Sequence, residues 1–121
     1  MKKWFENHCA YTMSKYGMSM CVLGMAEEFK NKGVAVNALW PQTAIATAAI
    51  NMLGGDQLMQ ASRKPDIVAD AAHWILTQNS KKCSGNFFID EDIIKQSLPD
   101  KNLDDYAVNP DVPLMPDFFL D

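Results

Sequence analysis

Residues 10–41 read AYTMSKYGMSMCVLGMAEEFKNKGVAVNALWP, and this segment is the most informative about the fold. Its first two thirds hold no proline, and apolar side chains recur at helical spacing, which predicts one long helix over about residues 7–32. Gly33 is placed to end that helix, because glycine readily adopts the left-handed conformation after a helix C-terminus. The nearly continuous apolar run 34–39 predicts a short strand buried on both faces, which Pro41 brings to an end.

The same alternation continues along the chain. A short alanine-rich helix is predicted over about residues 46–53, and the two glycines at 54–55 then lead into an irregular connection. Pro65 at the first helical position opens an amphipathic helix that runs to about residue 78. Residues 86–90, NFFID, predict a second short buried strand.

The order of helices and strands is that of an α/β fold with a parallel sheet and crossover helices. Two strands bury a sheet poorly, and the first helix is apolar on two sides, so on physical grounds the sequence looks like part of a larger domain. We expect residues 1–98 to belong to that domain. We expect residues 99–121, which are acidic and rich in proline, to form an extended tail packed on it through Phe118, Phe119 and Leu120.

Composition excludes several classes of function. The 121 residues are 48% hydrophobic and 21% charged with a net charge of −4, and no basic run exceeds two residues, so nucleic-acid binding is not expected. No apolar stretch reaches the ~20 residues of a membrane-spanning helix. The three cysteines show no C-x-x-C spacing, which argues against a disulfide framework or a zinc site. We expect a soluble protein of a reducing, intracellular compartment without a targeting signal of its own.

One pair of residues carries chemistry. Tyr11 and Lys15 are four residues apart, so their side chains project from one face of the helix, one turn from each other. An ammonium close to a phenol favours the phenolate and lowers its pKa towards the range of a general acid or base. Because a lysine follows a tyrosine at this spacing by chance in roughly one case in twelve, the pair alone is weak evidence.

The motifs around the Tyr11/Lys15 pair strengthen the evidence that the pair carries chemistry. The Tyr11/Lys15 pair is followed in order by the Lys32-Gly33 helix stop, by Val36-Asn37 in the strand and by Pro41. In this order and spacing the segment resembles the second half of the short-chain dehydrogenase/reductase family. The resemblance implies the C-terminal half of a Rossmann-type doubly wound parallel sheet, two strands with flanking helices, incomplete as it stands.

The resemblance also implies roles for these residues and the loop after them. Tyr11 would exchange a proton with an alcohol or carbonyl substrate, and Lys15 would hold the ribose hydroxyls of a nicotinamide cofactor, NADP or NAD. Ile45 and Thr47, in the loop after the proline, would hold the nicotinamide carboxamide. The family has a threonine at a shorter distance from the proline, so Thr43 competes with Thr47 for this role.

Other parts of the family pattern are not found. No G-x-x-x-G-x-G motif for the cofactor pyrophosphate occurs in this sequence, and ten residues precede Tyr11. Two hypotheses therefore stand. In the first, the chain acts as part of an oxidoreductase for a lipid-like or steroid-like alcohol or carbonyl, a homo-oligomer of the peroxisome or mitochondrion by resemblance. In the second, it is a truncated, inactive chain that acts, if at all, through a dimer-type protein interaction.

Some residues have simpler explanations. His8 and His73 lack partners at metal-ligand spacing, so we expect no metal site. The methionines are expected to be core and interface residues. Three consecutive carboxylates, Asp90, Glu91 and Asp92, do not converge at a strand end, so we expect a solvated turn there.

Overall fold

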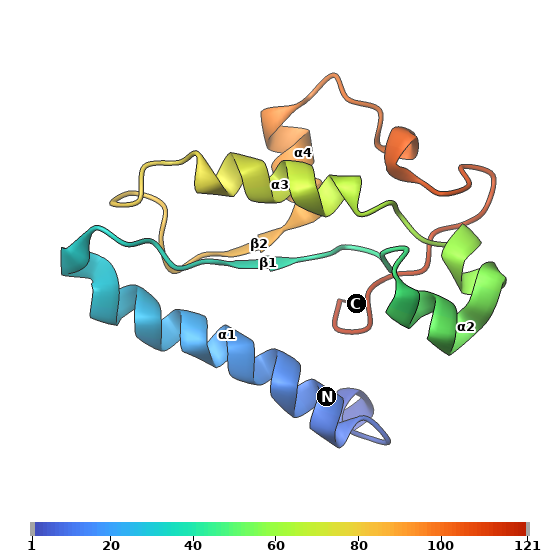
Figure 1. Ribbon diagram of the computed structural model, residues 1–121, viewed down its shortest axis with the longest axis horizontal. Helices are drawn as coiled ribbons and strands as arrows, with labels where there is room; N and C mark the ends of the chain where they lie inside the picture. The colour runs from blue at the N-terminus through green and yellow to red at the C-terminus, as the bar shows by residue number, and fades with distance from the viewer. Residues whose placement is uncertain (1, 121) are drawn as a thin grey trace. The chain divides into compact units, whose positions relative to one another are not determined.

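The computed structural model describes residues 2–120 (Figure 1). The chain divides into two compact units, one built from residues up to 38 together with 78–87, the other from 39–77 together with 88 onwards. Its elements in order are η1 (Lys2–Trp4), α1 (Cys9–Phe29), η2 (Lys30–Lys32), β1 (Ala38–Trp40), α2 (Ala48–Gln60), α3 (Asp66–Leu76), β2 (Phe87–Ile89), α4 (Asp90–Ser97) and η3 (Leu103–Tyr106). The predicted α/β fold with a two-stranded parallel sheet and flanking helices is confirmed.

The first strand is shorter than predicted. It begins only at Ala38, whereas we expected a strand from residue 34. The physical reason is that residue 36 pairs with a turn instead of a strand: Val36 N donates to Ser84 Oγ at 3.0 Å and Val36 O accepts from Gly85 N at 2.8 Å. Asn86 then starts the strand pairing, since its carbonyl accepts from Ala38 N at 2.9 Å.

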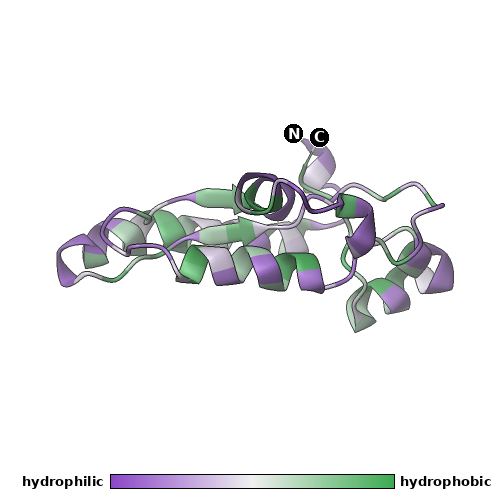
Figure 2. Cartoon of the chain, turned by 90° about the horizontal axis from the view of Figure 1, so that it is seen from above, coloured by the Kyte–Doolittle hydropathy of each residue, from purple (hydrophilic) through white to green (hydrophobic). Residues whose placement is uncertain are grey.

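The long helix α1 ends as predicted. After one 3-10 turn, Gly33 has a φ of 71°, the left-handed conformation that glycine tolerates best. The helix buries only Thr12, Val22 and Ala26. Several large apolar side chains are more than half exposed, namely Tyr11, Met13, Met18, Met20 and Leu23. These exposed apolar residues are interspersed with exposed polar residues along the helix, and Figure 2 colours the residues of the chain by their hydropathy.

The second unit has a closed apolar core. Its centre consists of buried side chains from α3, α4 and η3: Ile67, Ala71, Ile93, Ile94 and Tyr106. The amphipathic stripe predicted for α3 is confirmed in its first half, where Ile67 and Ala71 are fully buried, while Leu76 at its end is exposed. The helix begins one residue later than predicted, because Pro65 occupies the N-cap.

Two predictions in this unit were wrong. The irregular connection predicted after Gly54 and Gly55 is helical instead: Gly55 (φ 58°, ψ −155°) interrupts the helix where a break was predicted, but a second helical segment follows it to Gln60 within α2. The solvated turn expected at Asp90, Glu91 and Asp92 is the first turn of α4. Carboxylates suit this position, since the amide groups at a helix N-terminus favour negative charge.

The segment after α4 runs along the second unit. Phe119 is buried and packs edge-to-face on Trp40, with ring centroids 5.5 Å apart. Met115 O accepts a hydrogen bond from Ala44 N at 2.8 Å, so the segment also pairs with the loop after β1. Among residues 2–120, no helix has the length and apolar character that crossing a bilayer requires.

Candidate active site

Tyr11 lies in the first turn of α1, and Lys15 lies one turn further along. Lys15 Nζ is 5.5 Å from the centroid of the Tyr11 ring, within the range of a cation–π contact. The helix spacing alone produces this arrangement. Tyr11 is 52% exposed, so its phenol is accessible to a ligand. A cation beside an accessible phenol is an arrangement that suits proton exchange.

The start of α1 is fixed by hydroxyl groups. Thr12, next to Tyr11, is fully buried and donates through Oγ1 to the carbonyl of Trp4. Ser14 Oγ donates to the carbonyl of Tyr11 at 2.7 Å. These bonds hold the turn that presents Tyr11, whose own side chain stays on the surface.

Ile45 and Thr47 belong to the second unit, while Tyr11 and Lys15 belong to the first. Ile45 packs its side chain against the apolar core and forms a parallel bridge with Arg63. The bridge bonds come from its neighbours: Arg63 N donates to Ala44 O at 3.0 Å and Ala46 N donates to Arg63 O at 2.8 Å. Because N–H and C=O point in opposite directions across a trans peptide, the N–H and C=O of Ile45 face away from Arg63.

The two threonines of this loop differ. Thr47 is exposed and caps α2, where its side chain accepts from Ile50 N at 3.4 Å. Thr43 is buried, donates to the carbonyl of Ala44 at 3.2 Å and forms an antiparallel bridge with Pro116. Thr47 is therefore the threonine whose hydroxyl a ligand can reach.

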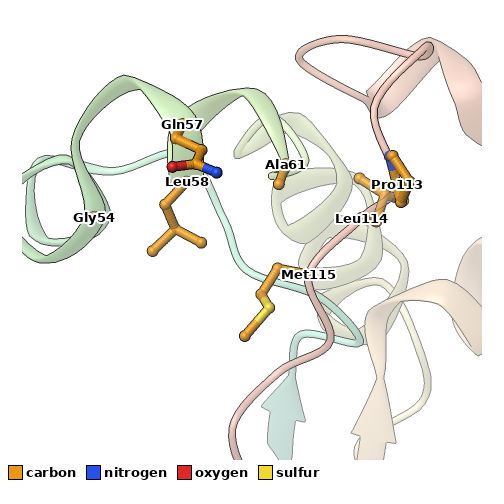
Figure 3. A pocket seen from close by; sticks show the side chains of 7 residues that line it. All are labelled: Gly54, Gln57, Leu58, Ala61, Pro113, Leu114 and Met115. Carbon is orange, nitrogen blue, oxygen red and sulfur yellow. The ribbon is translucent and has the colours of Figure 1, made fainter.

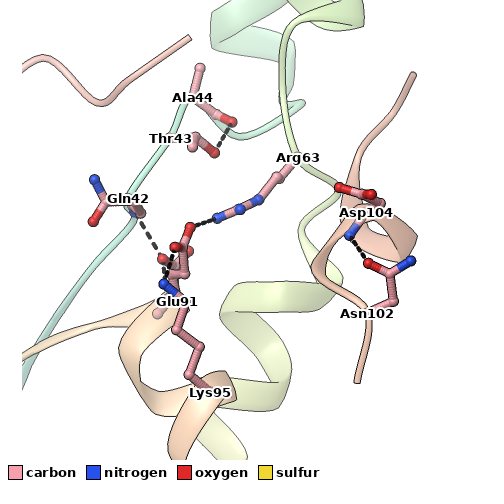
Figure 4. A network of polar contacts seen from close by, with 9 residues as sticks. Gln42, Thr43, Ala44, Arg63, Glu91, Lys95, Asn102 and Asp104 are labelled. Atoms are coloured by element: carbon pink, nitrogen blue, oxygen red, sulfur yellow. Dashed lines mark hydrogen bonds and ion pairs between the residues drawn. The ribbon is translucent and has the colours of Figure 1, made fainter. Parts of the chain in front are cut away.

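A buried polar cluster, which no local sequence pattern predicts, follows β2 (Figure 4). Asp90 is fully buried, and its Oδ1 accepts from Gln42 N at 2.8 Å and from Glu91 N at 2.7 Å. Glu91 bridges two cations, since Arg63 Nη1 lies 2.6 Å from its Oε2 and Lys95 Nζ lies 2.6 Å from its Oε1. Only the Glu91–Lys95 spacing, one helical turn, was visible in the sequence.

The pKa values of the two neighbouring carboxyl groups are shifted in opposite directions. Burial raises the pKa of Asp90, and the hydrogen bonds from the amides of Gln42 and Glu91 offset this only in part. Burial also raises the pKa of Glu91, but the bonds from Lys95 and Arg63 outweigh it, so that pKa lies below its ordinary value. Glu91 is thus held as a carboxylate by two cations.

An apolar pocket of about 490 Å³ lies between the second half of α2 and the tail (Figure 3). Leu58 and Met115 point into it from the two sides. Gln57 is the polar side chain among its lining residues, which also include Gly54, Ala61, Pro113 and Leu114. Among residues 2–120, no group of three or more His, Cys, Asp or Glu side chains could hold a metal ion.

Known proteins resemble this chain closely. It is 61% identical over 118 residues to hydroxysteroid dehydrogenase-like protein 2 of Xenopus laevis and 60% identical to the human protein of that name. Each match covers 98% of this chain and 28% of the relative. The chain is thus similar, over nearly its whole length, to a part of hydroxysteroid dehydrogenase-like protein 2 that makes up about a quarter of that protein (28%). No family model matches it.

Solved short-chain dehydrogenase structures share its fold. A short-chain dehydrogenase of Mycobacterium thermoresistibile superposes with a TM-score of 0.80 at 44% identity, covering 92% of this chain and 39% of that one. A Xanthomonas campestris protein described as a dehydrogenase gives a TM-score of 0.88 at 48% identity, covering 98% and 43%. The chain thus spans less than half the length of these dehydrogenases, which fits a partial Rossmann-type fold.

Proposed function

We propose that this chain supplies the acid/base pair and part of the cofactor site of a nicotinamide-dependent oxidoreductase of the short-chain type. The observation that carries the proposal is the Lys15 ammonium 5.5 Å from the ring of an accessible Tyr11. The dehydrogenase names of the relatives support the same kind of activity. In these relatives the matched region is part of a longer protein, and the proposed activity is that of such a whole protein.

In the proposed reaction Tyr11 moves a proton. Its hydroxyl donates to the carbonyl oxygen of a substrate during reduction, and the phenolate takes the proton from the alcohol during oxidation. Lys15 favours the phenolate through its charge and holds the ribose hydroxyls of the cofactor. The nicotinamide, when bound, supplies or accepts the hydride.

The loop residues fit a nicotinamide carboxamide. This group needs one hydrogen-bond donor and one or two acceptors. The N–H and C=O of Ile45 both face away from Arg63, and the Thr47 hydroxyl is exposed. We assign the carboxamide contacts to Ile45 and Thr47 and leave Thr43, which is buried, out of the site. The cofactor is NAD or NADP.

The substrate is proposed to be an alcohol or carbonyl compound with a lipid-like or steroid-like body. The apolar pocket lined by Leu58 and Met115 supports this class, because its lining has one polar side chain, Gln57. A pocket of this character favours an apolar chain or ring system over a charged metabolite. Leu58→Asp should raise KM for a fatty or steroid-like substrate while it leaves cofactor affinity unchanged.

The deciding experiment replaces Tyr11 with phenylalanine in the native product, whatever its length. Turnover should fall by roughly 10²–10⁴-fold, while the dissociation constant for NADH or NADPH stays within a factor of about two. Tyr16→Phe on the same helix is the matched control and should retain turnover. Retained turnover in Tyr11→Phe would overturn the assignment of Tyr11.

A second candidate function rests on the exposed apolar side chains of α1. Here the chain has no catalysis of its own and pairs with a second copy through Met13, Met20 and Leu23, each 60% exposed or more. Blotting source cells with an antibody to residues 99–121 gives the size of the native product. A band at 13.5 kDa whose purified protein dimerises and reduces no carbonyl favours this candidate. A much heavier, active product favours the oxidoreductase.

Two further expectations stay proposals. We propose that the product acts in the peroxisome or mitochondrion, which cell fractionation tests directly. We also propose that residues 1–98 and 99–121 behave as one domain with its tail, so protease removal of the tail should expose Trp40, the partner of Phe119.

A further inference from the structure

The geometry points to Asp90 as a positioning residue that holds the loop 42–47 in the shape proposed to bind the nicotinamide. Asp90 directly follows β2, and Gln42 comes two residues after the end of β1. Asp90 Oδ1 accepts from Gln42 N at 2.8 Å. Pro41 has no N–H, so the amide of Gln42 is the first backbone donor after β1. Its hydrogen bond to the Asp90 carboxylate therefore holds the first residue of the loop.

The next residue of α4 holds the other flank of the loop. Glu91 binds the guanidinium of Arg63 at 2.6 Å. The backbone of Arg63 in turn bonds Ala44 O and Ala46 N, the two groups on either side of Ile45. The first turn of α4 therefore fixes residues 42 and 44–46 together, and with them the direction in which Ile45 presents its N–H and C=O.

The tail fixes the same loop through backbone bonds only. Ala44 N donates to Met115 O at 2.8 Å, and Asp117 N donates to Gln42 O at 3.0 Å. Asp90 differs because it accepts through its side chain. A substitution at this position can therefore remove the hydrogen bond to Gln42 N while the backbone of the loop keeps its other bonds.

The burial of Asp90 is costly for stability. Its side chain is fully buried, and Oδ2 has no hydrogen-bond partner among the described residues. A buried carboxylate oxygen without a partner destabilises a fold, so a side chain that only fills space in the core is better apolar. The two backbone amides that donate to Oδ1, those of Gln42 and Glu91, account for a side-chain oxygen acceptor at this place.

The test compares three variants of the native product with the wild type. Asp90→Ala removes the acceptor, and Asp90→Asn keeps one at Oδ1. Asp92→Ala is the matched control, because Asp92 lies exposed in the same helical turn. Amide hydrogen exchange at residues 42–46 measures the loop, and fluorescence titration with NADH and NADPH measures cofactor affinity.

This inference rests on the proposed function. Amide exchange tests the role of Asp90 in the loop, and the titration tests cofactor binding, so a failure of one can be told from a failure of the other. Asp90→Ala should speed exchange at residues 42–46 and weaken cofactor binding, each by about tenfold, the equivalent of one hydrogen bond. Asp90→Asn and Asp92→Ala should stay within about threefold of the wild type in both measurements. If Asp90→Ala does not fold, Asp90→Asn carries the test, since it must then retain both properties.

Several outcomes overturn the inference. Exchange at residues 42–46 that is unchanged in Asp90→Ala removes the positioning role, whatever the cofactor does. Faster exchange with unchanged cofactor affinity shows that the loop shape does not matter for binding. A wild-type product that binds neither NADH nor NADPH overturns the proposed function itself, and the exchange data then decide separately whether Asp90 holds the loop.

Discussion

Helix α1 and the helix pair α3 and α4 use similar apolar residues in different ways. Over 21 residues α1 buries three side chains, whereas α3 and α4 place four apolar side chains at 2% exposure or less in one core. The buried apolar residues of α3 and α4 pack together in one core cluster. The comparison shows that apolar content does not by itself place a helix in a core. The helix also needs an apolar face that packs against an apolar face of another element.

The largest expected effect contrasts a core side chain with an exposed one. Ile94→Ala in α4 removes a side chain that is 1% exposed, and we expect the free energy of unfolding to fall by about 4 kcal/mol. Leu23→Ala in α1 removes one that is 60% exposed and should change it by less than about 0.5 kcal/mol. Urea denaturation followed by circular dichroism measures both. Equal losses would mean that α1 is part of a core after all.

The second contrast concerns ion pairs. Glu91→Gln breaks a pair whose Arg63 side chain is 6% exposed, and we expect a loss of about 3 kcal/mol because a buried cation is left unmatched. Glu27→Gln breaks the Glu27–Lys30 pair of α1, where both side chains are mostly exposed, and should have no measurable effect. The same denaturation experiment at pH 7 compares them.

The pH dependence of the Glu91 contribution has a definite sign. The pKa of Glu91 is lowered in the folded state, so its contribution is present above its ordinary pKa of 4.5 and is lost as the pH falls through the folded value. The stability difference between wild type and Glu91→Gln should therefore shrink in acid. A difference that grows below pH 4.5 would contradict the ion pair.

The third contrast concerns tyrosines. Tyr106 is buried and its hydroxyl donates to Asp70 Oδ2 at 2.6 Å, while Tyr11 is half exposed. Burial and the bond to Asp70 raise the pKa of Tyr106 to about 12, from an ordinary value of 10.0. The contribution of the Tyr106 hydroxyl to the free energy of unfolding is thus complete below pH 10.0 and is lost as the pH rises towards 12.

Tyr106→Phe should accordingly cost about 1.5 kcal/mol at pH 7, and that difference should diminish above pH 10. Tyr11→Phe is the control in the same measurement and should leave the free energy of unfolding unchanged. A pH-independent difference between wild type and Tyr106→Phe would show that the hydroxyl bond to Asp70 does not form.

The sequence predicted what depends on neighbours along the chain. Helical periodicity predicted α1 and α3, Gly33 predicted the helix end, and the spacing of Tyr11 and Lys15 predicted their contact on one face. These features need only three or four residues of context. The α/β class followed from the order of elements alone.

The sequence did not predict what depends on distant partners. Asp90 was expected in a solvated turn because the three carboxylates do not converge, yet its partner Gln42 is 48 residues away. The Arg63–Glu91 pair spans 28 residues. The pair Gly54-Gly55, inside α2, predicts the interruption at Gly55, but no local signal in the sequence shows that a second helical segment follows it to Gln60.

The smallest contrast uses glycines, and its two arms have opposite signs. A methyl group at Gly17 of α1 meets nothing within 4 Å, so Gly17→Ala should stabilise the protein by about 1 kcal/mol through helix propensity. A methyl group at Gly54 of α2 would lie 2.5 Å from Leu58 Cβ, which is fixed to the helix backbone. Gly54→Ala should therefore destabilise by about 1–2 kcal/mol, because the clash exceeds the gain in propensity.

Thermal unfolding of the two glycine variants measures both signs. Gly17→Ala also tests whether α1 is covered at this position in the native product, because a second protein surface packed closely against Gly17 would turn the expected gain into a loss. A gain in Gly17→Ala with a loss in Gly54→Ala would place the open helix surface at α1 and the tightly packed one at α2. Two losses would show that the surface of α1 around Gly17 is an interface, and the contrast between α1 and the core helices would then end at that position.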